Sequence, residues 1–511
     1  MNAPARKTGA GWRRIALAGL WLSSLPAFAQ QYRGFWVDAF NRGFKTPAQV
    51  DQLVKDVASA KCNAIFAEIR RRGDSYYLKS LEPPAEDPTY SPAFDALANL
   101  IEKAHAQGIE VHAWFPVNQL WTSPNPPQNP AHAFNQHGPT AINDDMWMSI
   151  NSAGKISGSV DPAHPAVFQY LLNVILEPAR NYNLDGLHLD YIRYNEDGIH
   201  GYNPTALDRF NRLYGRIDVP RGLDPEFSQF RRDQITALVR QIYLRAYAIR
   251  RSIKISAAVI TWGNGPRSDD EFKSSDAYSR VFQDWRGWLE EGILDVAVPM
   301  NYFRERQFPG YLDRWLEFEK DRQYGRMTVV GLGSYLNSVS ESVAQWTRAL
   351  EPSQNGNRAA GLVFYSYASP STLPDSSSLF SAAAGMFSDG NQIPELAWKS
   401  KPSRGQVSGT VSVSGGPAWL NDGVTIWIES DTGGSYVKKT ITDSTGFFGA
   451  VDLPPDRYRA RVEKDGREIC RTSPRDVDAG MVTDFSISIS ESDLSDVGRA
   501  LVSFPQNRSL R

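Results

Sequence analysis

Cysteine is almost absent from this 511-residue chain, which contains only Cys62 and Cys470. Two cysteines so far apart do not form the disulfide framework of a small secreted scaffold, and they lack the spacing of a zinc or haem site. We therefore expect both to be buried free thiols. Histidine is also scarce, with 7 residues and no HxH or HxxxH pair, so we expect no metal and no cofactor.

The chain also lacks a basic block and a strong excess of either charge. Its 55 Lys and Arg residues against 57 Asp and Glu residues leave a net charge of −2, which argues against nucleic acid as the main partner. No segment after residue 29 is long and apolar enough to span a membrane. We expect instead a polysaccharide as the partner, for the reasons that follow.

The first 29 residues are typical of an export signal. Lys7, Arg13 and Arg14 form a positive region, residues 15–25 are apolar, and Ala27-Phe28-Ala29 is a small-x-small cleavage site. We expect cleavage after Ala29 and a location in the periplasm or outside the cell.

Residues 30–398 alternate between strand-like and helix-like patterns. Eight apolar stretches of strand length begin near Tyr32, Asn63, Ile109, Leu184, Ile253, Leu294, Met327 and Ala360. Eight such units predict an α/β fold, the (β/α)8 TIM barrel. We prefer it to an open doubly wound sheet because no glycine-rich dinucleotide fingerprint follows the first strand. The Pro/Asn-rich excursion at 116–162 is too long for an ordinary connection and is predicted to be a functional loop.

The composition changes after the barrel. Residues 399–405 are predicted to be a linker, and residues 406–490 show short period-two stretches separated by Gly, Asp and Pro turns. This pattern predicts a small β-sandwich as an accessory domain. Residues 491–511 form a polar tail.

Each of the first four predicted strands carries an ionisable residue near its carboxyl end: Asp38, Glu68, His112 and Asp190. Alternation places each of them on one face with an aromatic residue or histidine of its own strand. Because charged groups are rarely buried unpaired, we expect the four to share a polar pocket at the barrel mouth, where active sites of this fold lie. For Asp190 alone, capping the next loop or pairing with Arg193 is the simpler alternative.

Hydrolysis of a glycosidic bond needs two carboxyl groups. Asp190 is the first choice for one role, and Glu68, Asp38 and Asp74 compete for the other. Glu68 has the best position, although an ion pair with Arg70 would keep it ionised and suit a nucleophile or a clamp better than an acid. The predicted catalytic pair is therefore Asp190 and Glu68.

Other residues at strand ends and in loops are predicted to bind the substrate. They are Asp38, Arg70, Asp74, His112, Trp114, His188, Tyr191, Arg193, Trp262, Asn301, Tyr302 and Tyr365. Aromatic rings suit the apolar faces of sugars. A satisfied place in the core is an equal alternative for the two histidines, as is a loop anchor for Asn301 and Tyr302.

Six segments, taken in order, resemble the glycosyl-hydrolase-like family ten of bacterial envelope proteins: 33–36, 62–77, 101–115, 185–194, 298–303 and 361–367. The resemblance implies a TIM barrel that hydrolyses a glycan, and characterised relatives point to peptidoglycan strands. It matches Asp190 to the family's strand-four Asp, and Arg70 and Asp74 to its Arg-x-x-Gly-Asp pattern. The family often has Gln at the position of Glu68.

The C-terminal segments 409–411 and 442–448 resemble a carboxypeptidase-regulatory-like sandwich, which implies a structural or wall-binding accessory. We expect the whole chain to be a secreted glycoside hydrolase of a bacterial polysaccharide. The alternative is a non-catalytic glycan-binding barrel of the envelope. A chitinase mechanism is rejected because Ile192 stands where its catalytic Glu would lie, and an amylase-like one because residues 257–263 contain no Glu.

Overall fold

The structure is a computed structural model that describes residues 30–372, 377–387, 392–464 and 466–495. The predicted export signal at 1–29 lies outside these residues. Of the predicted tail at 491–511, only α14 (Glu491–Ser495) is described.

Eight strand positions form a closed parallel barrel. In order around it they are β1 (Tyr32–Val37), β2 (Ala64–Glu68), β3 (Glu110–Pro116), β6 (Gly186–Asp190), β7 (Lys254–Val259), β8 (Val296–Asn301), the interrupted pair β9 (Met327–Thr328) and β10 (Val330–Leu332), and β11 (Gly361–Tyr365). The barrel closes where β8 pairs with β10 and β11 pairs with β1. The predicted TIM barrel is confirmed.

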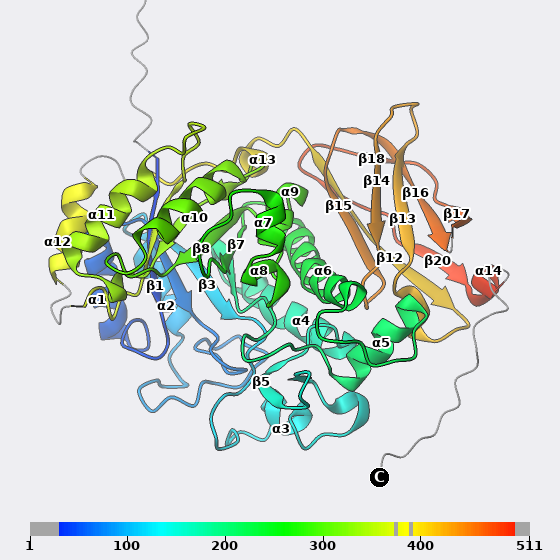
Figure 1. Cartoon of the computed structure of the whole chain (residues 1–511), viewed down its shortest axis with the longest axis horizontal. Coiled ribbons are helices and arrows are strands. Elements are labelled where there is room, and N and C mark those ends of the chain that lie inside the picture. The colour runs from blue at the N-terminus through cyan, green and yellow to red at the C-terminus, as the bar shows by residue number, and fades with distance from the viewer. Residues whose placement is uncertain (1–29, 373–376, 388–391, 465, 496–511) are drawn as a thin grey trace, which may run out of the picture.

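Helices pack around the barrel (Figure 1). They include α1 (Pro47–Ser59), α2 (Ala96–His105), α4 (Pro165–Asn181), α6 (Pro225–Ile249), α9 (Trp285–Glu291), α10 (Pro309–Asp321), α11 (Val339–Leu350) and α12 (Ser377–Met386). The first shows why these segments are helical: the Thr46 side chain caps the Gln49 amide, Pro47 begins the helix, and one apolar stripe is buried.

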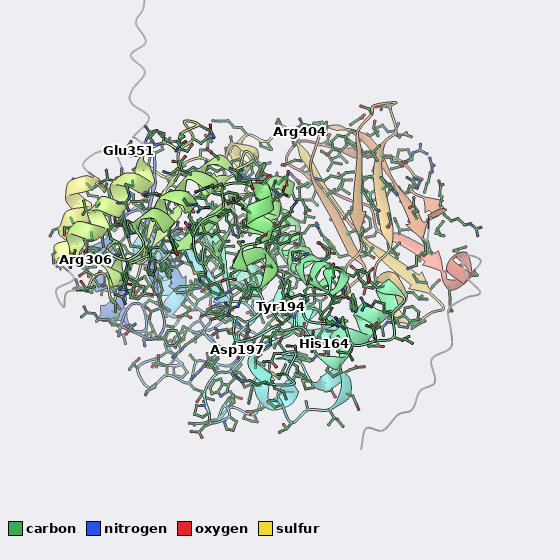
Figure 2. The ribbon with its side chains drawn as sticks, in the orientation of Figure 1. His164, Tyr194, Asp197, Arg306, Glu351 and Arg404 are labelled. Atoms are coloured by element: carbon green, nitrogen blue, oxygen red, sulfur yellow. The ribbon has the colours of Figure 1, made fainter. Side chains whose placement is uncertain are left out.

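Insertions enlarge the side of the barrel where the strands end. Between β3 and α4 lie α3 (Ala133–His137), η1 (Asn143–Asp145) and the hairpin of β4 (Met148–Ile150) and β5 (Ile156–Val160). The other insertions are α5 (Pro204–Tyr214) after β6, α7 (Asp269–Lys273) and α8 (Asp276–Ser279) after β7, and η2 (Ser334–Leu336) after β10. Figure 2 shows Tyr194 and Asp197, which follow β6, lower in the view than Glu351, which precedes β11. The strands therefore end toward the lower side, where Figure 1 shows α3 and β5.

Two apolar layers flank the barrel strands. The layer inside the barrel includes Trp36, Phe66, Trp114, Val298 and Val363. The outer layer fills the space between strands and helices and contains alternate residues of the same strands, such as Phe35 and Ile65. Strand alternation therefore decides which side chains point toward the barrel axis.

The C-terminal part consists of β-sheets beside α6 (Figure 1). Its strands are β12 (Gly405–Ser414), β13 (Thr425–Ser430), β14 (Val437–Ile441), β15 (Phe447–Leu453), β16 (Asp456–Lys464), β17 (Arg467–Arg471), β18 (Arg475–Val477), β19 (Val482–Asp484) and β20 (Ile487–Ser490). One sheet is built on β12 and the other on β13 and β16. The short helices α13 (Ala397–Ser400) and η3 (Ala418–Asn421) precede and follow β12. The structure is consistent with the predicted sandwich.

Both cysteines are free thiols, Cys62 buried and Cys470 partly buried. Within the described ranges, no helix combines the length and apolar character needed to cross a membrane.

Candidate active site at the barrel mouth

Three carboxylates lie together where β1, β2 and β6 end. Asp38, Glu68 and Asp190 are all buried. The charges of Asp38 and Asp190 both raise the pKa of Glu68, and all three carboxylates help to raise the pKa of Tyr365. The structure thus brings together the predicted catalytic pair and a third carboxylate.

Glu68 is surrounded in a way that favours its neutral form. Its Oε2 accepts a hydrogen bond from the Ala39 amide at 2.6 Å. Burial, followed by the nearby Asp38 and Asp190 charges, raises its pKa well above the usual range, against the opposing effects of the Ala39 hydrogen bond and Arg71. Glu68 therefore has the environment of a carboxylic acid that retains its proton.

The expected ion pair between Arg70 and Glu68 is not formed. Arg70 Nε instead donates to both oxygens of Glu82, at 3.0 and 2.8 Å, and Nη1 donates to the Gln119 carbonyl at 2.9 Å. The strand ends at Glu68, and the Ile69 amide then bonds to the Ala67 carbonyl. Because alternation stops there, Arg70 leaves the barrel face and braces the following loops.

Asp190 is held in a more polar environment. Trp114 Nε1 donates to its Oδ2 at 3.2 Å, and the Tyr191 amide donates to its Oδ1 at 2.7 Å. Arg193 Nη1 lies 3.9 Å from Oδ1. Burial raises the pKa of Asp190, while Arg193 and the two hydrogen bonds lower it. The net effect is a raised pKa, but these three contacts stabilise the charged form of Asp190 and limit the rise.

Asp38 serves partly as a turn anchor. Its Oδ1 accepts hydrogen bonds from the amides of Phe40 and Asn41 and from the Asn41 side chain, at 3.1, 3.0 and 2.9 Å. It therefore contributes negative charge beside Glu68 while it shapes the loop after β1.

Aromatic rings surround the carboxylates. Trp36 contacts Tyr302 and Tyr365, and the latter two stack with their ring centroids 5.3 Å apart. Trp114 also contacts Tyr365. Tyr335, in η2, contacts Tyr302 and Tyr365 and is 37% exposed. Sequence reasoning missed Tyr335, although its place directly after a barrel strand resembles that of Tyr302.

The two predicted histidines belong to the barrel interior instead of the mouth. His112 pairs in register with Gly186, the first residue of β6, stacks on Phe66 with centroids 4.5 Å apart, and contacts Glu110 at 3.1 Å. Strand alternation correctly predicted the face of β3 on which His112 lies. His112 lies too near the start of the strand to reach the barrel mouth.

His188 accepts a hydrogen bond from Trp36 Nε1 at 2.8 Å, and its other ring nitrogen lies 2.8 Å from the Ser256 hydroxyl. Burial lowers its pKa well below the ordinary value, so it is neutral. His188 therefore satisfies the core alternative, whereas His112 lies in the core with its Nδ1 unpaired among the residues that the structure describes.

Asn301 and Asp74 also serve other contacts. Asn301 Nδ2 donates to both Glu319 oxygens on α10, at 3.2 and 3.1 Å, because this position of β8 faces the helices. Asp74 accepts a hydrogen bond from the Glu86 amide at 3.2 Å, and its Oδ2 lies 3.9 Å from Arg72 Nε within the loop after β2. Burial raises the pKa of Asp74. These residues therefore anchor secondary structure around the site.

Two arginines near the carboxylates, Arg193 and Arg71, lie over aromatic rings. The Arg193 guanidinium lies 4.1 Å from the Tyr191 ring centre and 5.8 Å from that of Trp262. Arg71, whose charge lowers the pKa of Glu68, lies 3.8 Å from the ring centre of the exposed Phe40. Neither Arg71 nor Phe40 was predicted from the sequence, where the arginine-rich run after β2 marks only Arg71.

Comparison with known proteins places this geometry in context. The Glycosyl hydrolase-like 10 family model matches residues 31–347. Glycosyl hydrolase YngK of Bacillus subtilis (strain 168) is 22% identical over 338 residues, which cover 60% of this chain and 62% of the relative. Glycosyl hydrolase DigH of Escherichia coli (strain K12) is 22% identical over 260 residues, which cover 47% of this chain and 54% of the relative.

The matches therefore span little more than half the length of these curated relatives. Among solved structures, the glycoside hydrolase domain of PgaB (BpsB) from Bordetella bronchiseptica has a TM-score of 0.51 at 13% identity, covering 69% of this chain and 99% of that domain. At this identity, the likeness shows the fold.

Proposed function

Because the chain belongs to the glycosyl hydrolase-like 10 family, we propose that it is a glycoside hydrolase acting on a bacterial polysaccharide, with peptidoglycan glycan strands as the first candidate. The observation that carries the proposal is the group of three buried carboxylates at the barrel mouth, surrounded by aromatic rings. Two carboxyl groups in different electrostatic environments are what acid-assisted cleavage of a glycosidic bond requires.

In this proposal Glu68 is the general acid. Its burial and its carboxylate neighbours favour the protonated form, which can give a proton to the leaving oxygen. Asp190, which has two hydrogen-bond donors and Arg193 nearby, is the ionised partner that attacks the anomeric carbon or activates water. Because Arg70 pairs with Glu82, it does not form the ion pair with Glu68 that would hold Glu68 in its ionised form.

The aromatic side chains are proposed to bind the sugar rings. Tyr335 is the most accessible of the rings that contact the Tyr302–Tyr365 stack, and Trp114 links this group to Asp190. Flat apolar rings with polar edges match sugar faces bordered by hydroxyl groups. No step of the proposed reaction is assigned to His112 or His188.

The proposal is tested by incubating purified protein with peptide-stripped peptidoglycan and identifying the released sugars by mass spectrometry. Asp190→Asn and Glu68→Gln should each abolish release or reduce it by at least 100-fold, because each removes one half of the carboxyl pair. Glu319→Gln changes a buried carboxyl outside the barrel and serves as the matched control.

Binding of the strands without products from the wild-type protein would refute hydrolysis of this substrate and support the non-catalytic alternative. Release that persists in Asp190→Asn would refute the residue assignment.

We also propose that the protein is exported and acts in the periplasm or outside the cell, on the strength of the signal pattern at 1–29. Cell fractionation with N-terminal sequencing of the mature protein tests this, and the expected first residue is Gln30. The C-terminal sheets are proposed to act as a structural accessory.

A further inference from the structure

Arg193 has unused hydrogen-bonding capacity beside Asp190. Its side chain is 4% exposed, and its Nε and Nη1 atoms are buried with no hydrogen-bond partner among the described residues. Two carboxylates lie at ion-pair distance but beyond hydrogen-bond distance, Asp190 Oδ1 at 3.9 Å and Glu196 Oε2 at 3.8 Å. A buried guanidinium in this state favours an acceptor that completes its hydrogen bonds.

The backbone holds Arg193 in this position. Tyr191, the residue after Asp190, adopts a left-handed conformation with φ of 46°, which is unfavourable for a bulky side chain. This turn brings the Tyr191 amide onto Asp190 and the Tyr191 ring to within 4.1 Å of the guanidinium. Asn118 Nδ2 donates to the Arg193 carbonyl at 2.9 Å. The cation is thus preorganised at the reacting end of β6.

Glu196 is the contact that a ligand can replace. Its side chain is 46% exposed, in contrast to the 4% exposure of Arg193, so it can turn into solvent at little cost. The place it leaves faces a guanidinium, whose planar donors match a carboxylate in a two-bond arrangement. A sugar carboxylate can therefore take the position that Glu196 holds in the free protein.

We propose that Arg193 binds a carboxylate carried by the sugar next to the scissile bond, so that the site selects acidic glycans. This inference rests on the proposed function and adds the charge class of its substrate. Two sources share this chemistry: an acidic ether side chain on an amino sugar, and the ring carboxylate of a uronic acid. Neutral glycans lack the group that completes the Arg193 contacts.

Affinity measurements test the inference without requiring turnover. In a Glu68→Gln background, isothermal titration calorimetry compares peptide-stripped peptidoglycan strands with the same strands after their carboxylates are reduced to alcohols. We expect the reduced strands to bind at least tenfold more weakly, because an alcohol cannot replace the charge-assisted hydrogen bonds between a carboxylate and Arg193. Adding Arg193→Gln should equalise the two affinities, Arg193→Lys should restore part of the difference, and Glu196→Gln should preserve it.

A merely structural role for Arg193 would change both affinities together and leave their ratio intact. Equal binding of the two strands by the Glu68→Gln protein, or an unchanged ratio after Arg193→Gln, would overturn the inference. Oligogalacturonate provides the second arm: tighter binding of this ligand than of the peptidoglycan strands would assign the carboxylate to a uronic acid.

The two proposals fail in distinguishable ways. Cleavage of native and reduced strands by the wild type at the same kcat/KM refutes acidic selectivity and leaves hydrolysis standing. Absence of cleavage, together with a charge preference that Arg193→Gln abolishes, refutes hydrolysis and leaves the carboxylate contact standing.

Discussion

At the scale of single residues, Glu68 and Asp38 form a coupled pair across β1 and β2. The Ala39 amide, one residue beyond Asp38, donates to Glu68 at 2.6 Å, and the Asp38 charge helps to raise the pKa of Glu68. The protonation of Glu68 therefore depends on a neighbour that need not touch the substrate. This dependence can be measured through pH.

Asp38→Asn should shift the basic limb of the kcat/KM pH profile to lower pH. The variant removes a negative charge that raises the pKa of Glu68, so the proposed acid loses its proton earlier as the pH rises. Asp208→Asn, which changes an exposed carboxylate on α5, should leave the profile unchanged. A shift to higher pH would contradict the role of Glu68 as the acid.

Glu319 is a second buried carboxyl, on the outer side of β8. Burial raises its pKa to about 8, and both its oxygens accept hydrogen bonds from the side-chain amide of Asn301. Because the pKa in the folded state lies above that of the unfolded chain, the folded protein binds more protons between these values. Its contribution to stability is complete below about pH 4.5 and is lost as the pH rises to about 8.

Glu319→Gln should therefore flatten the pH dependence of the free energy of unfolding and stabilise the protein at pH 8. We expect an effect at pH 8 on the order of 4 kcal/mol, from the size of the pKa shift. Urea unfolding at pH 5 and pH 8 measures it, with the exposed Glu102→Gln on α2 as the control. Equal loss of stability between the two pH values in wild type and Glu319→Gln would contradict the argument.

At the scale of elements, the start of α11 shows how residue spacing selects the N-cap from two nearby serines. The helix begins at Val339, and Ser338 is its cap instead of Ser340. Ser338 Oγ accepts from the Glu341 amide, and Glu341 accepts from the Ser338 amide, which is a complete capping box. The Ser-x-x-Glu spacing was present in the sequence, and only Ser338 satisfies it.

Ser338→Ala should lower the free energy of unfolding by about 1 kcal/mol, because it leaves helix amides without their acceptor. Ser340→Ala, in the first turn of the same helix, should change it by less than about 0.5 kcal/mol. Urea denaturation of the two variants gives the comparison. Equal losses would show that the capping box does not stabilise α11.

Element prediction succeeded where the periodicity was long. The helices α4 and α5 lie in helix-like stretches of residues 30–398, and a Pro residue marks the first turn of each. Short elements without a full period were missed, including α7 and the β4–β5 hairpin inside the long excursion. These segments depend on contacts with the barrel more than on their own pattern.

At the scale of the whole molecule, the C-terminal sheets are fastened to the barrel. Arg209 on α5 and Asp422 form a buried ion pair, with Nη2 to Oδ1 at 2.9 Å. Arg326, before β9, bonds to Asp452 on β15 at 2.7 Å. Phe447 and Val451 of β15 join the outer apolar core of the barrel. The two parts therefore share buried contacts and are expected to unfold together.

Asp422→Asn should destabilise the full chain by about 3 kcal/mol or more, because it leaves the buried Arg209 charge without its partner. Asp476→Asn removes an exposed carboxylate of the same sheets and should be nearly neutral. Calorimetry of the two variants tests this, and wild-type thermal stability in Asp422→Asn would show that the interface is not coupled to folding.

The sequence by itself determined the class of the fold and the barrel face on which Asp38, Glu68 and Asp190 lie. Period-two and period-3.6 patterns are local, so they can be followed without knowing what packs where. Alternation also states on which side of a strand a residue points. It does not state how high that residue lies in a closed barrel or where the chain leaves the strand.

Only the tertiary structure decided those points. Strand register placed His112 beside the start of β6 instead of the mouth, and the turn at Ile69 sent Arg70 to Glu82. Asn301 meets Glu319 because α10 packs on the outer face of β8, and Arg193 returns to Asp190 because Tyr191 reverses the chain. Each of these is either a contact between segments distant in sequence or a single strained turn. Neither kind of feature produces a periodic pattern in the sequence from which it could be predicted.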